Sequence, residues 1–584
     1  MYAVPIFDVA RDFRHVGRYS RFNSITSQRQ QSGPMTNHLY YGDNLQVLRE
    51  HIATESVDLI YLDPPFNSQA TYNVLFRSPK GEQSQAQIEA FEDTWHWNNS
   101  AERAFDEVMI SGNTDAAEML RAMRAFLKEN DMMAYLTMMA VRLLELHRVL
   151  KPTGSLYLHC DPTASHYLKL LLDGVFGGDK FQSEVIWKRT SAHSAAKRWG
   201  DVHDVILFYS KSEKYGWNHV LLPHTSEYAG RYKNTDDRGR IWADDNLTAP
   251  GVRHGFSGAV WRGYDVTAKG NHWKISAKAV EELIGKEQAS KLNTIEKLEI
   301  LDKNGLIHWP HSGGFPRFKR VLSGGIAIQD LITDIPPLNS QAQERLGYPT
   351  QKPLALLERI ISASSNPDDV ILDPFCGCGT AVHAAQKLGR QWIGIDVTHL
   401  AISLIEKRLN DAFPGIKYDV HGTPKDLAGA RDLAERDKYQ FQWWAVSLVN
   451  AVPYGGKKKG ADTGIDGIIY FKPDGKTTEK AIVSVKGGMN VGVAMVKDLI
   501  ATVDREKAKI GVFVTLTTPT KPMEKEAVTA GFYQTDYGKF PKIQILTIEN
   551  LFAGKKPQMP WLDPATFKKA AREDMNARKQ EKLL

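Results

Sequence analysis

Short apolar runs alternate along the chain with longer segments in which apolar residues recur at every third or fourth position. Residues 57–62, VDLIYL, form such a run and predict a buried strand. Residues 131–149 have the spacing of a long amphipathic helix and lead into another apolar run at 155–160, while residues 38–52 predict a short strand, a turn and a helix. This alternation is typical of an α/β fold, in which helices cover both faces of a parallel sheet.

The pattern changes several times, and each change marks an expected boundary. The periodicity gives way to short irregular pieces rich in Gly, Trp, Arg and His after about residue 190, returns after 345, and is followed by a new composition near 420. We expect a flexible N-terminal arm at residues 1–36, a first α/β half at 37–190 and an irregular insert at 191–345. A second α/β half at 346–415, a smaller α/β domain at 420–560 and a charged tail at 561–584 should follow.

Composition narrows the class of protein. A chain of 584 residues is long enough for two or three domains, and 42% hydrophobic with 24% charged residues is typical of a globular protein. No apolar run approaches the roughly 18–20 residues of a membrane span, and no secretory signal is visible, so we expect a cytoplasmic protein without a membrane partner. Three cysteines exclude a disulfide framework and a cysteine zinc site. The net charge of +6 permits a polyanionic partner.

The segment 370–396 has the order of a nucleoside-binding βαβ unit. A strand at 370–372 meets a turn with Gly377 and Gly379, a helix follows, and a second strand ends at Asp396. The glycines let backbone approach a ligand closely, and an acid at the tip of the second strand can accept both ribose hydroxyls. Taken alone, the turn is equally well explained as a tight strand-to-helix connection.

One feature of the loop favours a cofactor that has a nucleoside but no pyrophosphate. A dinucleotide site needs a third glycine, and this loop has Thr380 and Ala381 there instead. The loop also contains two cysteines, Cys376 and Cys378, which are better explained as small side chains packed around the turn than as metal ligands.

The strand at 57–62 ends in the tetrapeptide Asp63-Pro64-Pro65-Phe66, and the later loop reads Phe375-Cys376-Gly377-Cys378-Gly379. Together these motifs resemble the DNA amino-methyltransferases that use S-adenosylmethionine, in which a (D/N/S)PP(Y/F/W) motif ends one strand and an F-x-G-x-G loop ends another. Their order, with the catalytic motif first and the cofactor loop last, is similar to the family's beta arrangement. The resemblance implies a Rossmann-like methyltransferase sheet, with residues 191–345 as an inserted target-recognition region and double-stranded DNA as the partner.

The same resemblance implies which residues hold the cofactor. The methionine end is expected at Asp373, Phe375, Gly377 and Gly379, with Thr380 beside them, the ribose at Asp396, and the adenine near Asp43. Lys352, in the segment YPTQKPLALLERII that resembles the family's closing segment, is expected to hold the cofactor's polar end, or else to be a surface lysine before a helix.

Transfer to an exocyclic amine explains why the family needs residues 63–66. An adenine N6 lone pair is delocalised into the ring, so the enzyme must localise it and align it with the sulfonium methyl group. Asp63 and the Pro64 carbonyl can each accept one amine hydrogen, and Pro64 and Pro65 fix the direction of that carbonyl. Phe66 offers a flat face for a base that has been extruded from the duplex.

The target is less defined than the reaction. Asp at the first motif position resembles the adenine-N6 members, whereas many cytosine-N4 members have Ser, so adenine is favoured and cytosine N4 is the alternative. An RNA amino-methyltransferase and a DNA-binding subunit with a decayed methyltransferase fold also stay open. The resemblance leaves open both a homodimer, as in many beta-arrangement relatives, and a protein that acts alone.

The segment after 420 has motifs of its own. Asp466 precedes a predicted strand, and Lys486 lies in the next strand of a predicted hairpin. This resembles the Mrr-like branch of the PD-(D/E)xK nucleases, in which two such ligands bind Mg2+ and the lysine helps activate water. The second ligand position is Ser484, a weaker ligand than a carboxylate. Either Asp462 or Glu479 completes the metal site and the protein also restricts DNA, or the domain binds DNA or a partner without cutting.

Overall fold

A computed structural model describes the chain at residues 37–65, 71–77, 83–92, 97–190, 197, 199–310, 313–339, 342, 344–346, 350–454, 464–474, 477–536, 538–560 and 571–573. The expected arm at 1–36, the motif residue Phe66, the alternative metal ligand Asp462 and most of the expected tail lie outside these residues. In the described part of the chain, no helix is long and apolar enough to cross a membrane.

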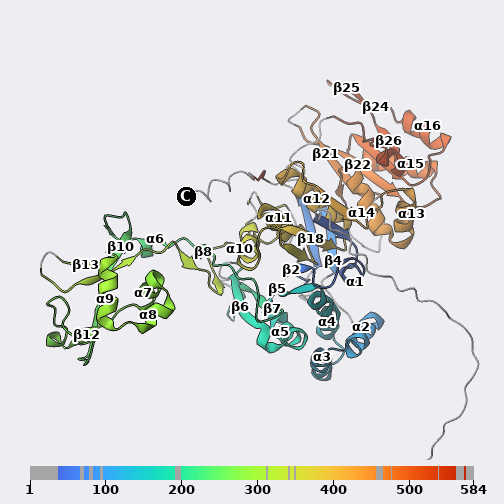
Figure 1. Cartoon of the computed structure of the whole chain (residues 1–584). Coiled ribbons are helices and arrows are strands. Elements are labelled where there is room, and N and C mark those ends of the chain that lie inside the picture. The colour runs from blue at the N-terminus through green and yellow to red at the C-terminus, as the bar shows by residue number, and fades with distance from the viewer. Residues whose placement is uncertain are drawn as a thin grey trace, which may run out of the picture. The chain divides into compact units, whose positions relative to one another are not determined.

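A nine-stranded sheet, with strands from residues 37 to 421, has the order β16-β6-β7-β5-β2-β17-β18-β1-β19 (Figure 1). Its strands are β1 (Asn37–Tyr41), β2 (Val57–Leu62), β5 (Leu150–Cys160), β6 (Phe181–Lys188), β7 (His203–Ser210), β16 (Leu331–Ile332), β17 (Val370–Asp373), β18 (Gln391–Asp396) and β19 (Tyr418–His421). Neighbours from β5 to β19 in this order are parallel, whereas β7 runs antiparallel to β5 and β6. The predicted α/β fold is confirmed, with one reversed strand that the sequence did not indicate.

Helices cover both faces of the sheet because apolar side chains alternate along its strands. Ile60 and Leu62 face a core formed with one set of helices, while Leu59 and Tyr61 face a second core. The first set is α1 (Asn44–His51), α2 (Asn99–Met109), α3 (Thr114–Leu127), α4 (Asp131–Val149) and α5 (Pro162–Phe176). The second set is α10 (Leu354–Ser364), α11 (Thr380–Lys387) and α12 (His399–Ala412). A separate antiparallel pair, β3 (Thr71–Arg77) and β4 (Gln83–Glu92), follows β2 in the chain.

Strand pairing extends the sheet beyond the boundaries expected from the periodicity. β7 and β16 both pair within it, so the insert leaves the sheet after Ser210 and returns by Leu331 rather than spanning 191–345. β19 adds a further strand as far as His421. The apolar runs of β16 and β19 are too short to show a period, which is why the pattern did not reveal them.

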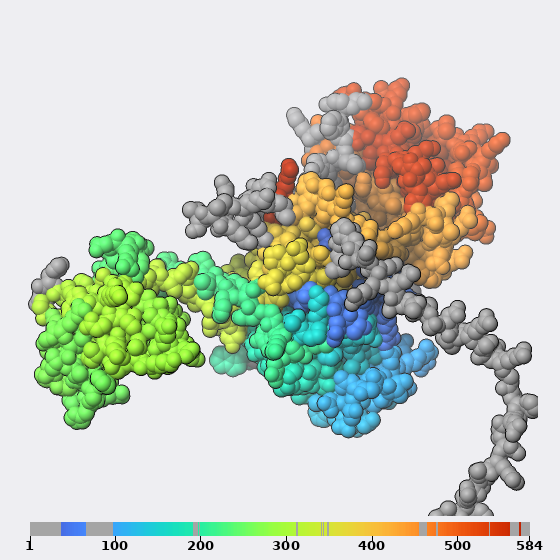
Figure 2. Space-filling view, viewed as in Figure 1, coloured from blue at the N-terminus to red at the C-terminus, as the bar shows by residue number. Residues whose placement is uncertain are grey.

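The insert contains small antiparallel sheets and four short helices, and its residues are green in Figures 1 and 2. Its strands are β8 (Leu221–Leu222), β9 (Asn234–Thr235), β10 (Ile241–Asn246), β11 (Thr248–Pro250), β12 (Asn271–Trp273), β13 (Ile307–His308), β14 (Arg317–Val321) and β15 (Ile326–Ala327), and its helices are α6 (Ser226–Ala229), α7 (Ala277–Ile284), α8 (Lys286–Lys291) and α9 (Thr294–Lys303). Trp261 and Trp273 are buried in its core with their rings edge to face, 5.7 Å apart. These tryptophans therefore stabilise the insert itself.

The C-terminal α/β domain has a five-stranded sheet in the order β20-β21-β22-β23-β26. Its strands are β20 (Val452–Pro453), β21 (Gly467–Phe471), β22 (Glu479–Lys486), β23 (Ile510–Thr515) and β26 (Ile543–Thr547), with a separate pair β24 (Phe532–Thr535) and β25 (Gly538–Pro541). Its helices are α13 (Leu427–Arg436), α14 (Lys438–Leu448), α15 (Val493–Arg505), α16 (Lys521–Thr529) and α17 (Ile548–Phe552). β21 and β22 form the predicted antiparallel hairpin, and cores on both sheet faces complete the domain.

Candidate functional site

Four aspartates follow or end four neighbouring parallel strands at the same edge of the large sheet. Asp63 follows β2, Asp373 ends β17, Asp396 ends β18, and Asp43 lies two residues after β1. The carboxyl ends of parallel strands meet at one edge, and the crevice there is where ligands of open α/β sheets bind. The topology therefore gathers acids that are up to 353 residues apart in the sequence (396 − 43 = 353).

A cavity of about 260 Å³ lies at this edge and is lined by all four aspartates. Of the residues assigned to the site from the sequence, it is also lined by Pro65, Lys352, Phe375, Gly377 and Thr380. Pro64 is buried beside Asp63, and Gly379 begins helix α11 behind the loop. The structure thus brings together the described residues that the sequence assigned to the cofactor and to catalysis.

The loop between β17 and α11 takes its shape from two glycines with left-handed backbone. Gly377 has φ 49° and Gly379 has φ 74°. A Cβ atom on Gly379 would lie 2.8 Å from Cγ1 of Ile405, so a side chain there would force the loop or the Ile405 side chain to shift. The loop is closed by the Gly377 N–H, which donates to Asp396 Oδ2 over 2.9 Å.

Asp396 and Asp373 carry unusual pKa values because both are enclosed. Burial raises the pKa of Asp396 to about 6, although hydrogen bonds from Thr398 and Gly377 oppose the shift. Burial also raises the pKa of Asp373 well above its ordinary value, the Phe375 N–H opposes this, and the charges of Asp63 and Asp396 add to it. Desolvation and like charge both disfavour a second negative charge in so small a space. No lysine or arginine of the described residues forms an ion pair with either group.

Asp43 serves the local fold as well as the cavity. Its side chain caps α1 by accepting from the backbone of Leu45 and Gln46, and it forms an ion pair with Arg142 over 2.7 Å. The neighbouring Asn44 is buried, accepts a hydrogen bond from Arg142 Nε, and donates to the carbonyl of Pro374 over 2.8 Å. Asn44 therefore ties the start of α1 directly to the loop that follows β17.

Asp63, the acid of the tetrapeptide, is held by a lysine that follows the insert in the sequence. Lys352 Nζ lies 2.5 Å from Asp63 Oδ2, and the lysine is only 8% exposed. Lys352 therefore lies inside the site, and it is not the surface lysine that was the alternative explanation. No other hydrogen bond joins the Asp63 side chain to the described part of the chain, so its second carboxylate oxygen is open to a ligand.

A buried chain of polar groups runs across the sheet behind Asp63. The Tyr61 hydroxyl lies 2.9 Å from His159 Nδ1, His159 Nε2 lies 3.0 Å from Asp204 Oδ2, and Arg189 pairs with the other oxygen of Asp204 at 2.9 Å. Burial alone would raise the pKa of Asp204, but its bond to His159 and the charges of Lys352 and Arg189 lower it. The chain joins β2, β5 and β7 at the end of the sheet where Asp63 lies.

Sequence reasoning did not find Asn44, Arg142, Tyr61, His159 or Asp204. The signal for His159 was present, since a histidine followed by Cys160 and an acid at the end of a buried strand repeats the placement of Asp63. Arg142 and Asp204 carry no local signal, because their role depends on which strands and helices become neighbours.

The C-terminal domain gathers its three expected residues at one end of the hairpin. The Asp466 N–H donates to the carbonyl of Val483 over 2.9 Å, and its Oδ2 accepts from the Val485 N–H over 2.5 Å. Ser484 and Lys486, two positions apart on β22, point to the same face. Glu479 starts β22 opposite Phe471, at the other end of the hairpin, and so cannot join Asp466 at one ion.

This donor set does not fit a Mg2+ ion on the described residues alone. Mg2+ requires near-octahedral oxygen coordination that usually includes one or two carboxylates. Asp466 supplies one carboxylate, of which one oxygen already accepts a backbone hydrogen bond, and Ser484 supplies only a hydroxyl. No group of three metal-ligating side chains includes Asp466 within the described ranges.

Comparison with known proteins agrees with this geometry. Residues 57–407 match the family model described as DNA methylase, of the N6/N4 type, and residues 433–540 match the model described as restriction endonuclease. The type II methyltransferase M.EcaI of Enterobacter cloacae is 31% identical over 379 residues, which are 64% of this chain and 69% of that protein. The Mod subunit of the type III restriction-modification enzyme StyLTI of Salmonella typhimurium is 28% identical, over 60% of this chain and 50% of its own length.

Among solved structures, a putative DNA modification methylase from Thermus thermophilus is 14% identical with a TM-score of 0.31, over 66% of this chain and 99% of its own. The methylase model alone spans 351 of the 584 residues (407 − 57 + 1 = 351), and it includes both sequence motifs and the insert between them. The chain therefore belongs to the N6/N4 DNA methylase family and carries a C-terminal domain of the Mrr-like restriction endonuclease type.

Proposed function

We propose that this DNA methyltransferase transfers a methyl group from S-adenosylmethionine to N6 of adenine in double-stranded DNA. One observation carries the proposal: Asp63, the acid of the amine-binding tetrapeptide, lines the same cavity as Asp373, Gly377 and Asp396. A methyl donor bound by the loop and an amine bound by Asp63 would then meet inside a single site.

The charge of the cavity supports S-adenosylmethionine as the ligand. Four carboxylates and two cationic side chains line it, and Arg142 and Lys352 are each paired with one of those carboxylates. Asp373 and Asp396 are left to face a ligand. S-adenosylmethionine brings a sulfonium and an ammonium group, so its positive charge relieves the repulsion that raises the pKa of Asp373.

Each part of the cavity suits one part of this cofactor. Asp396 has oxygens at the tip of β18, where they can accept the ribose hydroxyls, and Asp43 lies at the end of the next strand, near the expected adenine. Gly377 exposes bare backbone where the methionine end would pass, with Phe375 and Thr380 on the cavity walls, and Gly379 lets the loop pack against Ile405 behind it. When bound, the cofactor supplies an electrophilic methyl group.

The chain's own residues prepare the amine. Asp63 accepts one N6 hydrogen through its open oxygen and the Pro64 carbonyl accepts the other, which localises the nitrogen lone pair and stabilises its developing positive charge. Lys352 fixes the Asp63 carboxylate in direction while it binds the other oxygen. Phe66, which lies outside the described residues, is proposed to stack on the extruded base.

Adenine is proposed over cytosine because the motif begins with Asp, as in the adenine-N6 members that it resembles. The family model covers both N6 and N4 enzymes and so does not decide the base. Recognition of DNA by the insert stays a prediction, which footprinting can test. Light scattering can decide between a homodimer and a protein that acts alone.

For the C-terminal domain we propose DNA binding without efficient cleavage. The observation behind this proposal is the incomplete oxygen donor set around Asp466, Ser484 and Lys486. Mg2+-dependent cutting by the unmodified protein would contradict it and would mean that a residue outside the described ranges, such as Asp462, completes the site.

The test of the main proposal is mass spectrometry of nucleosides from unmethylated DNA after incubation with the protein and S-adenosylmethionine. We expect N6-methyladenine, and none with Asp63→Ala. N4-methylcytosine would overturn the base while leaving the site intact. Absence of both products on DNA of varied sequence, with methylation of RNA, would overturn the substrate.

A further inference from the structure

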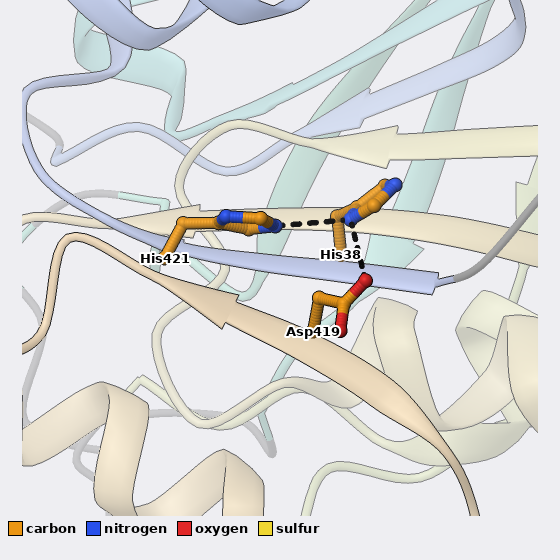
Figure 3. Close-up of side chains that lie close together, drawn as sticks. All are labelled: His38, Asp419 and His421. Atoms are coloured by element: carbon orange, nitrogen blue, oxygen red, sulfur yellow. Dashed lines mark hydrogen bonds and ion pairs between the residues drawn. The ribbon is translucent and has the colours of Figure 1, made fainter. Parts of the chain in front are cut away.

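Three potential metal ligands share one face of the sheet at its edge. His38 on β1 lies directly opposite Asp419 on β19, and Tyr40 lies opposite His421. Residues two apart on a strand point to the same side, so His38, Asp419 and His421 project from the same face of two neighbouring strands. Figure 3 shows the two imidazole rings turned towards each other, with the carboxylate of Asp419 beside them.

The donor atoms already have nearly the spacing of a metal site. His38 Nδ1 lies 3.1 Å from His421 Nε2 and 3.9 Å from Asp419 Oδ2, and all three ligand atoms lie within 4.8 Å of one another. Bond lengths of about 2.0–2.2 Å in a tetrahedral zinc site put neighbouring ligand atoms roughly 3.3–3.5 Å apart. An ion would therefore need only small side-chain rotations, and it would replace the hydrogen bond between the rings.

The backbone and rings around these ligands are held by contacts that do not depend on a metal. The Tyr40 ring stacks on His421 with centroids 4.5 Å apart and planes at 17°. After β19 the chain turns at Gly422, where an added Cβ would lie 2.1 Å from the carbonyl oxygen of Tyr41. This close approach presses the end of β19 against β1, so little order has to be gained when an ion binds.

Both histidines are suited to bind at neutral pH, where a ligand must be unprotonated. Burial lowers the pKa of His38, and Asp419 partly opposes the shift. Burial and the nearby His38 lower the pKa of His421, with Asp419 opposing and Lys425 and His51 adding to the effect. Both nitrogens of the His38–His421 contact can face an ion once the donating ring changes tautomer, which moves its proton to its other nitrogen and releases none.

We propose that His38, Asp419 and His421 bind one divalent ion of the Zn2+ class, which joins the edge strand β19 to β1. Two imidazoles and one carboxylate favour Zn2+, Co2+ or Ni2+ over Mg2+ or Ca2+, which prefer oxygen ligands alone. None of the three residues lines the cofactor cavity. The ion is thus structural, placed where the chain leaves the sheet for the C-terminal domain, and the proposal does not depend on the methyltransferase assignment.

The test uses the untagged full-length protein after treatment with a chelator. Equilibrium dialysis against Zn2+ measures affinity and stoichiometry, and Co2+ titration adds a visible absorption spectrum that reports tetrahedral nitrogen and oxygen ligands. His38→Gln and His421→Gln remove one ligand each, and Asp419→Asn removes the exposed carboxylate with least risk to folding. His51→Gln is the matched control, because His51 also stacks on Tyr40 but lies outside the ligand group.

We expect about one Zn2+ per chain, with affinity at least about tenfold weaker in the three ligand variants and unchanged in His51→Gln. Zn2+ should also protect β1 and β19 from amide hydrogen exchange in the unmodified protein. The proposal is overturned if the unmodified protein shows no Co2+ spectrum and no bound Zn2+ at micromolar free metal. It is equally overturned if Asp419→Asn and His38→Gln, with native circular dichroism, bind as tightly as the unmodified protein.

Discussion

Lys352 Nζ lies 2.5 Å from Asp63 Oδ2, although 289 residues separate the two in the chain. The contact joins the tetrapeptide at 63–66, which follows β2, to the segment just ahead of α10, and the whole insert lies between them in the sequence. An ion pair with both partners mostly buried fixes direction, since neither side chain gains by turning to solvent. The carboxylate that we propose for catalysis is therefore oriented by the half of the protein that also holds the proposed cofactor loop.

Removing either partner of this pair should affect turnover more than cofactor binding. We expect Asp63→Ala to lower kcat by more than about 100-fold, because it removes a group that stabilises charge in the transition state. Lys352→Gln should lower kcat by about 100-fold through misplacement of Asp63. S-adenosylmethionine titration by calorimetry should give a Kd within about threefold of the unmodified protein for both. A large rise in Kd for Lys352→Gln alone would mean that Lys352 holds the cofactor's polar end instead.

Cofactor affinity should depend on pH through Asp396. The pKa of this group is raised from its ordinary value to about 6 in the folded protein, so it is mostly protonated at pH 5 and ionised at pH 7.5. A carboxylate accepts two ribose hydroxyls better than a carboxylic acid does, so binding should strengthen as pH rises through 6. We expect Kd at pH 5 to be about tenfold weaker than at pH 7.5, from the ionised fraction. Asp396→Asn should bind weakly at both pH values, and an equally steep profile in that variant would exclude Asp396 as the titrating group.

Alanine substitutions at two glycines with similar backbone angles can distinguish the effect of backbone strain from the effect of close packing. Gly379 and Gly389 have φ values of 74° and 71°, but an added Cβ meets Ile405 at 2.8 Å only at Gly379 and meets nothing within 4 Å at Gly389. Each alanine substitution should cost about 1 kcal/mol of stability from left-handed backbone. Only Gly379→Ala should displace the loop and raise the Kd for S-adenosylmethionine by about tenfold or more. Equal Kd values in the two variants would show that the loop tolerates the side chain.

The buried chain from Tyr61 through His159 to Asp204 predicts a positioning role for His159. We expect His159→Gln to lower kcat about tenfold, with the Kd for cofactor unchanged, because β2 would lose the contact that steadies its catalytic end. Tyr157→Phe is the matched control: Tyr157 lies on the same strand and face, but its hydroxyl bonds to Ser364, away from Asp63. Fluorescence of 2-aminopurine at the target base reads base extrusion directly. If His159→Gln and Tyr157→Phe lowered kcat equally, the loss would come from general destabilisation of the protein and not from a positioning role of His159.

The sequence predicted the parts of this site that are local and missed those that are not. Strand 57–62, the helix at 131–149 and the βαβ unit at 370–396 each follow from periodicity, because their own residues bury an apolar face. The contacts of Arg142 and Asp204 are made with residues of strands and helices that are distant in the sequence, so no local pattern could predict them. The short strands β16 and β19 owe their existence to pairing with β6 and β1, which no local pattern records.

The proposed binding role of the C-terminal domain can be tested by restoring the missing carboxylate. Ser484 points to the same face as Lys486 and lies beside Asp466, so Ser484→Asp would place a second carboxylate where the resembling nucleases carry one. We expect the unmodified protein to bind duplex DNA without cutting it, and Ser484→Asp to gain Mg2+-dependent cutting, because two carboxylates can hold the ion. Ser484→Asn matches the size without the charge and should stay inactive, as should Ser484→Asp combined with Lys486→Ala. Linearisation of unmethylated plasmid by the unmodified protein, lost in Lys486→Ala, would show instead that the domain is a working nuclease.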